Sequence, residues 1–130
     1  MKTKGNNSPV LPDRGGQPER QGVHLLFVCT YNEMRSSTAE TVFTAEGLNA
    51  RSAGTDRWAT VPLTREIILW ADIVFVMEEK HSVFITSEFQ DVSEGKRIIV
   101  LGIPDNYYYM EPALTEMLKE RVAPHLENDK

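Results

Sequence analysis

The only cysteine of this 130-residue chain, Cys29, follows a short apolar run in the segment LLFVCTYNEMRSSTAE. Arg35 lies six positions further on, and Ser36 comes directly after it. A thiolate can act as a nucleophile, and a planar guanidinium can bind two oxygens of one phosphate group. These residue types and spacings indicate a site that attacks a bound phosphoryl group. A lone cysteine after a strand is more commonly core packing, so the surrounding elements decide between the two interpretations.

The elements around Cys29 are predicted to form an anion-binding loop. Residues 23–28 are a continuous apolar run, which is typical of a strand covered on both faces. A helix is predicted to begin near Ser36, because Ser37 and Glu40 have the spacing of a capping box. Between this strand and this helix, loop N–H groups and the positive end of the helix dipole converge on one point. An anion or a thiolate is stabilised there.

Apolar runs and amphipathic stretches alternate along the rest of the chain. Further strands are predicted at 48–52, 73–77 and 97–101, and further helices at 62–70, 78–89 and 112–126. This alternation predicts an α/β fold with three αβα layers, in which an open, parallel, four-stranded sheet lies between helices. Ligands of such sheets bind beyond the carboxyl ends of the strands, which is where Cys29 lies.

Composition and charge exclude several classes of protein. The chain is 41% hydrophobic and 25% charged, which is ordinary for a soluble globular domain. A net charge of −5 argues against a nucleic-acid partner, because such binding rests on clustered Lys and Arg. Apolar runs are too short to span a bilayer, so no membrane association is expected.

The expected organisation is a tail followed by one catalytic domain. Residues 1–22 are rich in Gly, Pro and charge and are predicted to be disordered, whereas 23–130 form the domain. The N-terminus lacks the apolar core of a signal peptide, and a single cysteine cannot form an internal disulfide. We therefore expect a cytoplasmic protein.

The segment VCTYNEMRSS resembles the phosphate loop of the low-molecular-weight protein tyrosine phosphatases. In that family a cysteine, five residues that include an asparagine, and Arg-Ser follow one another. Segments similar to the rest of the family occur in the same order: HLLFVC, STAETVF, RSAGT, ADIVFVMEEKH and IPDNYYY. The resemblance covers nearly all of residues 23–126 and extends to short bacterial members with an IPD-x-Y loop.

The resemblance implies a flavodoxin-like, phosphotyrosine phosphatase I-like fold. It also implies hydrolysis of phosphotyrosine or similar aryl phosphates through a phosphocysteine, without metal or cofactor. Cys29 would be the nucleophile and Arg35 the clamp on the transition state. Ser36 would donate to the cysteine sulfur, Asn32 would hold a left-handed turn, and Ser52 would hydrogen-bond Asn32 from the second strand. The loop residues expected to bind the phosphate are Thr30, Tyr31, Asn32, Glu33, Met34, Arg35 and Ser36.

The resemblance leaves two candidates for the general acid. The family has an aspartate in an Asp-Pro pair followed by aromatic residues. Asp105 in PDNYY is preferred, although no proline follows it. Glu111 is followed by Pro112, but it is expected to lie where the last helix begins. The aromatic side chains expected to line the substrate cleft are Tyr31, Trp58, Tyr107 and Tyr108.

Several features depart from the family pattern and keep alternatives open. Glu33 opposes both a thiolate and a phosphate, so it is expected to point into solvent. Met34 replaces a second cysteine of the family loop. One alternative is a pseudo-enzyme that captures a phosphorylated partner without turnover. Another is a thiol-dependent arsenate reductase, which is less favoured because that chemistry uses additional cysteines.

The three histidines have no metal-ligand spacing. His24 is expected to start a strand, and His81 and His125 are expected to be solvated.

Overall fold

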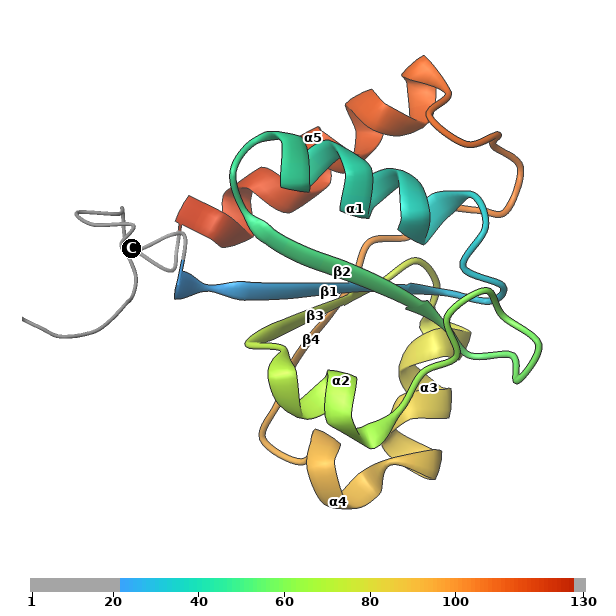
Figure 1. The fold of residues 1–130 in the computed structure, drawn as a ribbon, viewed down its shortest axis with the longest axis vertical. Coiled ribbons are helices and arrows are strands. Elements are labelled where there is room, and N and C mark those ends of the chain that lie inside the picture. Colours follow the sequence, from blue (N-terminus) through green and yellow to red (C-terminus); the bar gives the residue numbers. More distant parts are fainter. Residues whose placement is uncertain (1–21, 128–130) are drawn as a thin grey trace, which may run out of the picture.

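Four short strands form one parallel sheet in the computed structural model, which describes residues 22–127 (Figure 1). The strands are β1 (His24–Cys29), β2 (Asn49–Gly54), β3 (Ile73–Val76) and β4 (Arg97–Val100). Their order is β2-β1-β3-β4, so β1 and β3 lie in the centre of the sheet. Apart from Gly22, the segment predicted to be a disordered tail lies outside the described residues.

Helices cover both faces of the sheet, which confirms the predicted α/β fold with three layers (Figure 1). One face carries α1 (Arg35–Ala45) and α5 (Pro112–Glu127). The other carries α2 (Arg65–Trp70), α3 (Glu79–Glu88) and the short α4 (Gln90–Ser93), which lies beyond the helix predicted at 78–89. No helix among residues 22–127 has the length and apolarity needed to cross a bilayer.

The central strand β1 is buried on both faces because its side chains alternate between two cores. Leu25 and Phe27 face α1 and α5, whereas Leu26 and Val28 face α2 and α3. Burial of an aliphatic or aromatic side chain contributes roughly 1.5–3 kcal/mol. The double burial explains why β1 reads as a continuous apolar run and why the position of its last residue, Cys29, is firmly held.

The predicted capping box of the first helix is wrong. Helix α1 begins at Arg35, two residues before Ser37. The hydroxyl of Ser37 donates to the carbonyl oxygen of Glu33 (2.6 Å), and the carboxylate of Glu40 accepts from Ser52 (2.5 Å). The helix starts early because the loop after β1 turns directly into it, which places Arg35 and Ser36 in its first turn.

The second helix begins later than predicted. Its N-cap is Thr64, whose hydroxyl oxygen accepts from the N–H of Ile67 (3.2 Å), so α2 starts three residues after the proposed Pro62. Pro62 instead pairs with Gly54 in an isolated bridge at the end of β2. The segment between β2 and α2 is therefore held against the carboxyl edge of the sheet.

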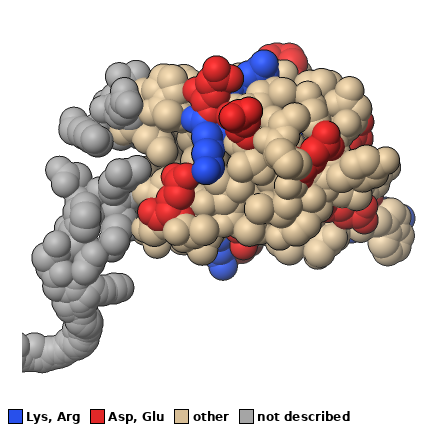
Figure 2. Space-filling model, turned by 90° about the horizontal axis from the view of Figure 1, so that it is seen from above, with Lys and Arg blue, Asp and Glu red and all other residues tan. Residues whose placement is uncertain are grey.

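Charge is mixed on the face formed by α1 and α5. Figure 2 shows acidic and basic side chains interspersed there. Lys119 and Glu46 pair across the two helices at 3.7 Å. Such mixing is typical of solvated helix surfaces.

Candidate active site

The loop after β1 is held from outside by the segment that follows β2. The carbonyl oxygen of Cys29 accepts from the N–H of Thr55 (2.9 Å), and that of Thr30 accepts from Asp56 (3.0 Å). The carbonyl oxygen of Tyr31 likewise accepts from Thr60 (3.1 Å). Because these carbonyl groups bond outward to the neighbouring segment, the N–H groups of the loop can face its interior.

Gly54, the last residue of β2, permits this close approach. A Cβ at that position would lie 2.6 Å from the carbonyl oxygen of Thr30 and 2.6 Å from Cβ of Ala59. Any larger residue would therefore push the loop away from β2.

The sulfur of Cys29 receives hydrogen bonds from the loop and from the first turn of α1. The N–H of Asn32 donates to Sγ at 3.2 Å, and Oγ of Ser36 lies 3.0 Å from it. Oγ of Ser36 also accepts from Nδ2 of Asn32 at 2.8 Å, so its own hydrogen is available to the sulfur. Asn32 has φ of 60°, the left-handed conformation predicted for it, which asparagine tolerates better than most residues. This arrangement stabilises a thiolate.

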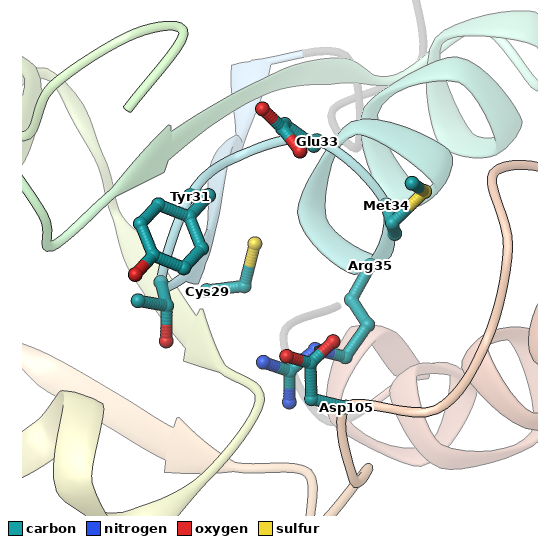
Figure 3. Close-up of a pocket in the computed structure, with 7 residues that line it drawn as sticks. Cys29, Tyr31, Glu33, Met34, Arg35 and Asp105 are labelled. Carbon is teal, nitrogen blue, oxygen red and sulfur yellow. Dashed lines mark ion pairs between the residues drawn. The ribbon is translucent and has the colours of Figure 1, made fainter. Parts of the chain in front are cut away.

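Arg35 is buried, with 2% of its surface exposed, and its guanidinium is fixed at one nitrogen. Nη1 donates to Oε2 of Glu78 (2.5 Å) and to the carbonyl oxygen of Ile103 (2.7 Å). Nε lies 3.8 Å from Oδ1 of Asp105, whose carboxylate lies beside the guanidinium (Figure 3). The edge formed by Nε and Nη2 is the one that can bind two oxygens of a phosphate.

A cavity of about 190 Å³ opens above the sulfur. It is smaller than the roughly 300–1,000 Å³ of sites for drug-sized ligands, and it suits a phosphoryl group with part of the side chain that bears it. The residues that line it are Cys29, Thr30, Tyr31, Glu33, Met34, Arg35 and Asp105. Both Asp105 and Arg35 therefore reach the cavity that contains Cys29, as the sequence predicted.

Glu33 lies at the rim of this cavity and is exposed. Its carboxylate points away from the sulfur of Cys29 (Figure 3). The expected orientation toward solvent is therefore found, and water can screen its charge from the interior of the loop.

The predicted aromatic lining is found at Tyr31 alone among its four proposed members, all of which the structure describes. Trp58 is 78% exposed, and the guanidinium of Arg57 lies over its ring, 5.2 Å from the centroid. Tyr107 packs against the core between the sheet and α5, and Tyr108 is 77% exposed. Tyr107 does not line the cavity because its side chain packs, partly buried, against the core.

Asp105 and Glu111 occupy different environments in the loop before α5. The carboxylate of Asp105 is 61% exposed in the cavity. Glu111 lies directly before Pro112, the first residue of α5; its carboxylate accepts from the N–H of Tyr108 (2.9 Å) and its carbonyl oxygen from Thr115 (2.9 Å). Glu111 is therefore a helix-start residue, as expected.

Helix α1 anchors the end of the same loop. The N–H of Met110 donates to the buried hydroxyl of Thr38 (2.8 Å), and the hydroxyl groups of Tyr109 and Thr41 lie 2.8 Å apart. The helix that carries Arg35 thus also positions the segment that carries Asp105.

The predicted contact between Ser52 and Asn32 is wrong for the described chain. Ser52 donates to the carboxylate of Glu40 (2.5 Å), whereas the side-chain amide of Asn32 donates to Ser36. A carboxylate is a stronger acceptor than an amide, and Glu40 on α1 faces β2 at this point. Ser36 therefore holds Asn32 from the first turn of α1.

The prediction that His81 is solvated is also wrong. His81 is 1% exposed, and its ring joins two segments of the site. Nδ1 accepts from the N–H of Glu78 (3.0 Å), and Nε2 lies 2.9 Å from Oγ1 of Thr30. Burial, and then the positive charge of Arg35, lower the pKa of His81 from 6.5 to about 4. Its ring is therefore neutral at pH 7.

Glu78 and His81 form the capping box of α3, with Glu78 as N-cap and His81 at the third helical position. The hydrogen bond from Arg35 lowers the pKa of the Glu78 carboxyl, which is ionised at neutral pH. The sequence held a signal for this pair: an acid directly after a buried strand, followed three positions later by a side chain that can reach back. Within residues 22–127, no cluster of three or more His, Cys, Asp or Glu could hold a metal ion.

Solved structures with the same fold include phosphatases. A YwlE mutant from Bacillus subtilis is 25% identical and covers 82% of this chain and 97% of its own, with a TM-score of 0.62. A YwlE arginine phosphatase with a phosphorylated active-site serine is 26% identical, covers 83% and 98%, and has a TM-score of 0.65. The low-molecular-weight protein tyrosine phosphatase of Streptococcus pyogenes is 17% identical, covers 82% and 92%, and has a TM-score of 0.68. The sequence matches no family model and no curated protein.

Proposed function

We propose that this chain, which has the fold of the low-molecular-weight protein tyrosine phosphatases, is a cysteine-dependent phosphatase acting on phosphotyrosine or similar aryl phosphates. One observation carries the proposal. The sulfur of Cys29 accepts the N–H of Asn32 at 3.2 Å on the floor of a small cavity whose wall holds Arg35. A stabilised thiolate and a bidentate cation then face the same bound group.

In the first half-reaction, loop N–H groups and the Nε–Nη2 edge of Arg35 bind the phosphoryl oxygens. The thiolate of Cys29 attacks phosphorus, so an S–P bond forms as the P–O bond to the aryl group breaks. Asp105, which lines the cavity beside Arg35, delivers a proton to the departing aryl oxygen. The products are the free phenol and a phosphocysteine.

In the second half-reaction, Asp105 takes a proton from a water molecule that attacks the same phosphorus. The S–P bond breaks, and the thiolate leaves with its charge stabilised by Ser36 and the N–H of Asn32. Inorganic phosphate departs, so one water is consumed for each ester hydrolysed. In the YwlE arginine phosphatase, an active-site serine that replaces cysteine carries a phosphoryl group, which supports covalent transfer in this fold.

A second substrate class, phosphoarginine, has one observation in its favour. Glu33 and Asp105 both line the cavity, Glu33 at its exposed rim, so two carboxylates are available to a leaving group that extends out of it. Carboxylates bind guanidinium groups through paired hydrogen bonds, whereas a phenol gains nothing from the second one. The YwlE structures named above include an arginine phosphatase.

The cellular setting follows from the nucleophile. A thiolate that must stay reduced fits a cytoplasmic location, and the partner of the enzyme would be a phosphorylated protein or a small aryl phosphate. Arsenate reduction is disfavoured because Cys29 is the only thiol in the sequence. Capture of a phosphorylated partner without turnover is distinguished by the kinetic test below.

The test compares wild type with Cys29→Ser on p-nitrophenyl phosphate, a phosphotyrosine peptide and phosphoarginine. We expect Cys29→Ser to lose about a thousand-fold or more in kcat while still binding vanadate or phosphate, because the loop and Arg35 remain. Turnover that survives in Cys29→Ser would overturn the covalent mechanism. Binding without turnover in the wild type would favour a pseudo-enzyme that captures a phosphorylated partner.

The choice of substrate is tested at Glu33. Glu33→Gln should lower kcat/KM for phosphoarginine several-fold and leave the phosphotyrosine peptide unchanged or improved, because the lost charge favours only a cationic leaving group. A wild type that prefers phosphotyrosine and a Glu33→Gln effect that is equal for both substrates would exclude phosphoarginine.

A further inference from the structure

His81 is a buried ionisable side chain in contact with the site that the proposed mechanism does not use. We propose that His81 is a positioning residue. Its neutral ring holds the loop next to Cys29 in the correct position relative to the guanidinium of Arg35. This inference rests on the proposed function. It adds to that function the residue that sets the distance between the attacking sulfur and the guanidinium.

The hydrogen bonds of the ring determine where its proton lies. A backbone N–H can only donate, so Nδ1, which receives the N–H of Glu78 at 3.0 Å, carries a lone pair. In a neutral imidazole the proton then lies on Nε2, which donates to Oγ1 of Thr30 at 2.9 Å. A cationic ring would carry a hydrogen at Nδ1 as well, and that hydrogen would oppose the N–H of Glu78. The geometry therefore requires the neutral ring, in agreement with its low pKa.

These contacts connect Cys29 to Arg35 through side chains at the start of α3. Thr30 directly follows Cys29, and His81 binds its hydroxyl. His81 and Glu78 bind each other in the capping box, and Glu78 holds Nη1 of Arg35 at 2.5 Å. The loop after β1 and the start of α1 are thereby both joined to the start of α3.

The path matters because phosphoryl transfer depends on alignment. A displacement of about 1 Å in a catalytic group can cost roughly a hundred-fold in rate. Without the ring, the hydroxyl of Thr30 would lose its hydrogen-bond donor. The N–H of Glu78 would lose its acceptor in the capping box. The phosphate would still meet the same loop, so the proposal predicts a loss in kcat larger than the change in KM.

Two substitutions distinguish the effect of losing the hydrogen bonds of His81 from the effect of losing its side-chain volume. His81→Leu keeps an apolar side chain of similar size and removes both hydrogen bonds. His81→Gln keeps one acceptor and one donor separated by a single carbon, as in the ring, and glutamine suits this position of a capping box. The matched control is Ile85→Ala, which removes a fully buried side chain from the same helix, away from the cavity.

The experiment measures kcat and KM for p-nitrophenyl phosphate at 25 °C, together with Tm, for these variants. We expect His81→Leu to lower kcat at least tenfold and His81→Gln to recover most of it, whereas Ile85→Ala lowers Tm and leaves kcat within about twofold. A kcat within twofold of wild type in His81→Leu, or a loss in Ile85→Ala as large as in His81→Leu, would overturn the proposal.

Two further measurements keep this inference separate from the proposed function. If wild type hydrolyses none of the substrates, the proposed function fails, and positioning is judged by the dissociation constant of vanadate. We expect that constant to rise at least fivefold in His81→Leu and to recover in His81→Gln, while an unchanged constant overturns the inference. A ¹H–¹⁵N spectrum at pH 7 should show the ring proton of His81 on Nε2, and a proton on Nδ1 would contradict it.

Discussion

Oε2 of Glu78 lies 2.5 Å from Nη1 of Arg35, so the buried guanidinium has a carboxylate partner before any phosphate arrives. A buried cation without a partner is costly. Glu78 lies two residues after β3, as the N-cap of α3, whereas Arg35 opens α1, so their pairing depends on the parallel alignment of β1 and β3. The pair uses one nitrogen and leaves the opposite edge of the guanidinium for substrate.

Glu78→Gln should therefore weaken the binding of the transition state by Arg35. A charge-assisted hydrogen bond contributes roughly 1.5–3 kcal/mol, so we expect kcat/KM to fall on the order of 10- to 100-fold. Glu79→Gln, at the exposed neighbouring position, is the control and should remain within about twofold. Steady-state kinetics on an aryl phosphate measure both, and equal activity of the two variants would contradict the role of Glu78.

Asp105→Asn should lower kcat most strongly for substrates with poor leaving groups. General acid catalysis contributes roughly a hundred- to ten-thousand-fold, so a phosphotyrosine peptide should lose far more than p-nitrophenyl phosphate. Glu111→Gln should leave kcat nearly unchanged, because Glu111 binds the N–H of Tyr108 at the start of α5. The reverse pattern, measured with both substrates, would move the acid to Glu111.

Gly54→Ala should disturb the loop through backbone contact alone. The added Cβ would lie 2.6 Å from the carbonyl oxygen of Thr30, so the loop or β2 must shift. Overpacking of this kind costs roughly 1–3 kcal/mol, and we expect a lower Tm together with a loss of kcat. Gly22→Ala, which meets nothing within 4 Å, is the control and should behave as wild type in thermal melts and kinetics. Wild-type stability in Gly54→Ala would show that this approach is not required.

Stability should fall as the pH drops below 7 because His81 is neutral in the fold. Burial and the charges of Arg35 and Lys80 lower its pKa from 6.5 to about 4, against the opposing influence of Glu78 and Asp105. Between these values the unfolded chain binds the extra proton, so lowering the pH favours unfolding. One pKa unit corresponds to about 1.4 kcal/mol, which gives a loss of about 2 kcal/mol between pH 7 and pH 5.

Urea unfolding of wild type and His81→Gln at pH 7 and pH 5 measures this contribution. The loss attributed to His81 should vanish in the glutamine variant, which does not titrate. The carboxyl of Glu78 contributes at lower pH, since its pKa is lowered by Arg35 and its stabilisation is lost only below the ordinary value of 4.5. An equal pH dependence in both proteins would contradict the buried, neutral state of His81.

Local sequence patterns were sufficient to predict most helices and strands. They were also sufficient to predict the site residues that lie in one contiguous segment of the chain. The apolar run before Cys29 predicted β1, and the spacing to Arg35 predicted the loop, because strand, loop and helix are neighbours in sequence. The left-handed turn at Asn32 was implied by the family resemblance, and asparagine tolerates that conformation better than most residues. The start of α1 near Ser36 was predicted correctly, but Ser37 is not its cap, because Arg35 and Ser36 already lie in the first helical turn.

The sequence by itself determined the α/β fold, the nucleophile loop and the position of Asp105 in the last loop. Tertiary structure alone decided that Glu78 pairs with Arg35, that the buried His81 contacts Thr30, and that Tyr107 packs against the core. These contacts join residues up to dozens of positions apart, and they exist only because parallel strands bring their carboxyl ends to one edge. A side chain's neighbours across that edge depend on strand order and helix placement, which no local pattern records.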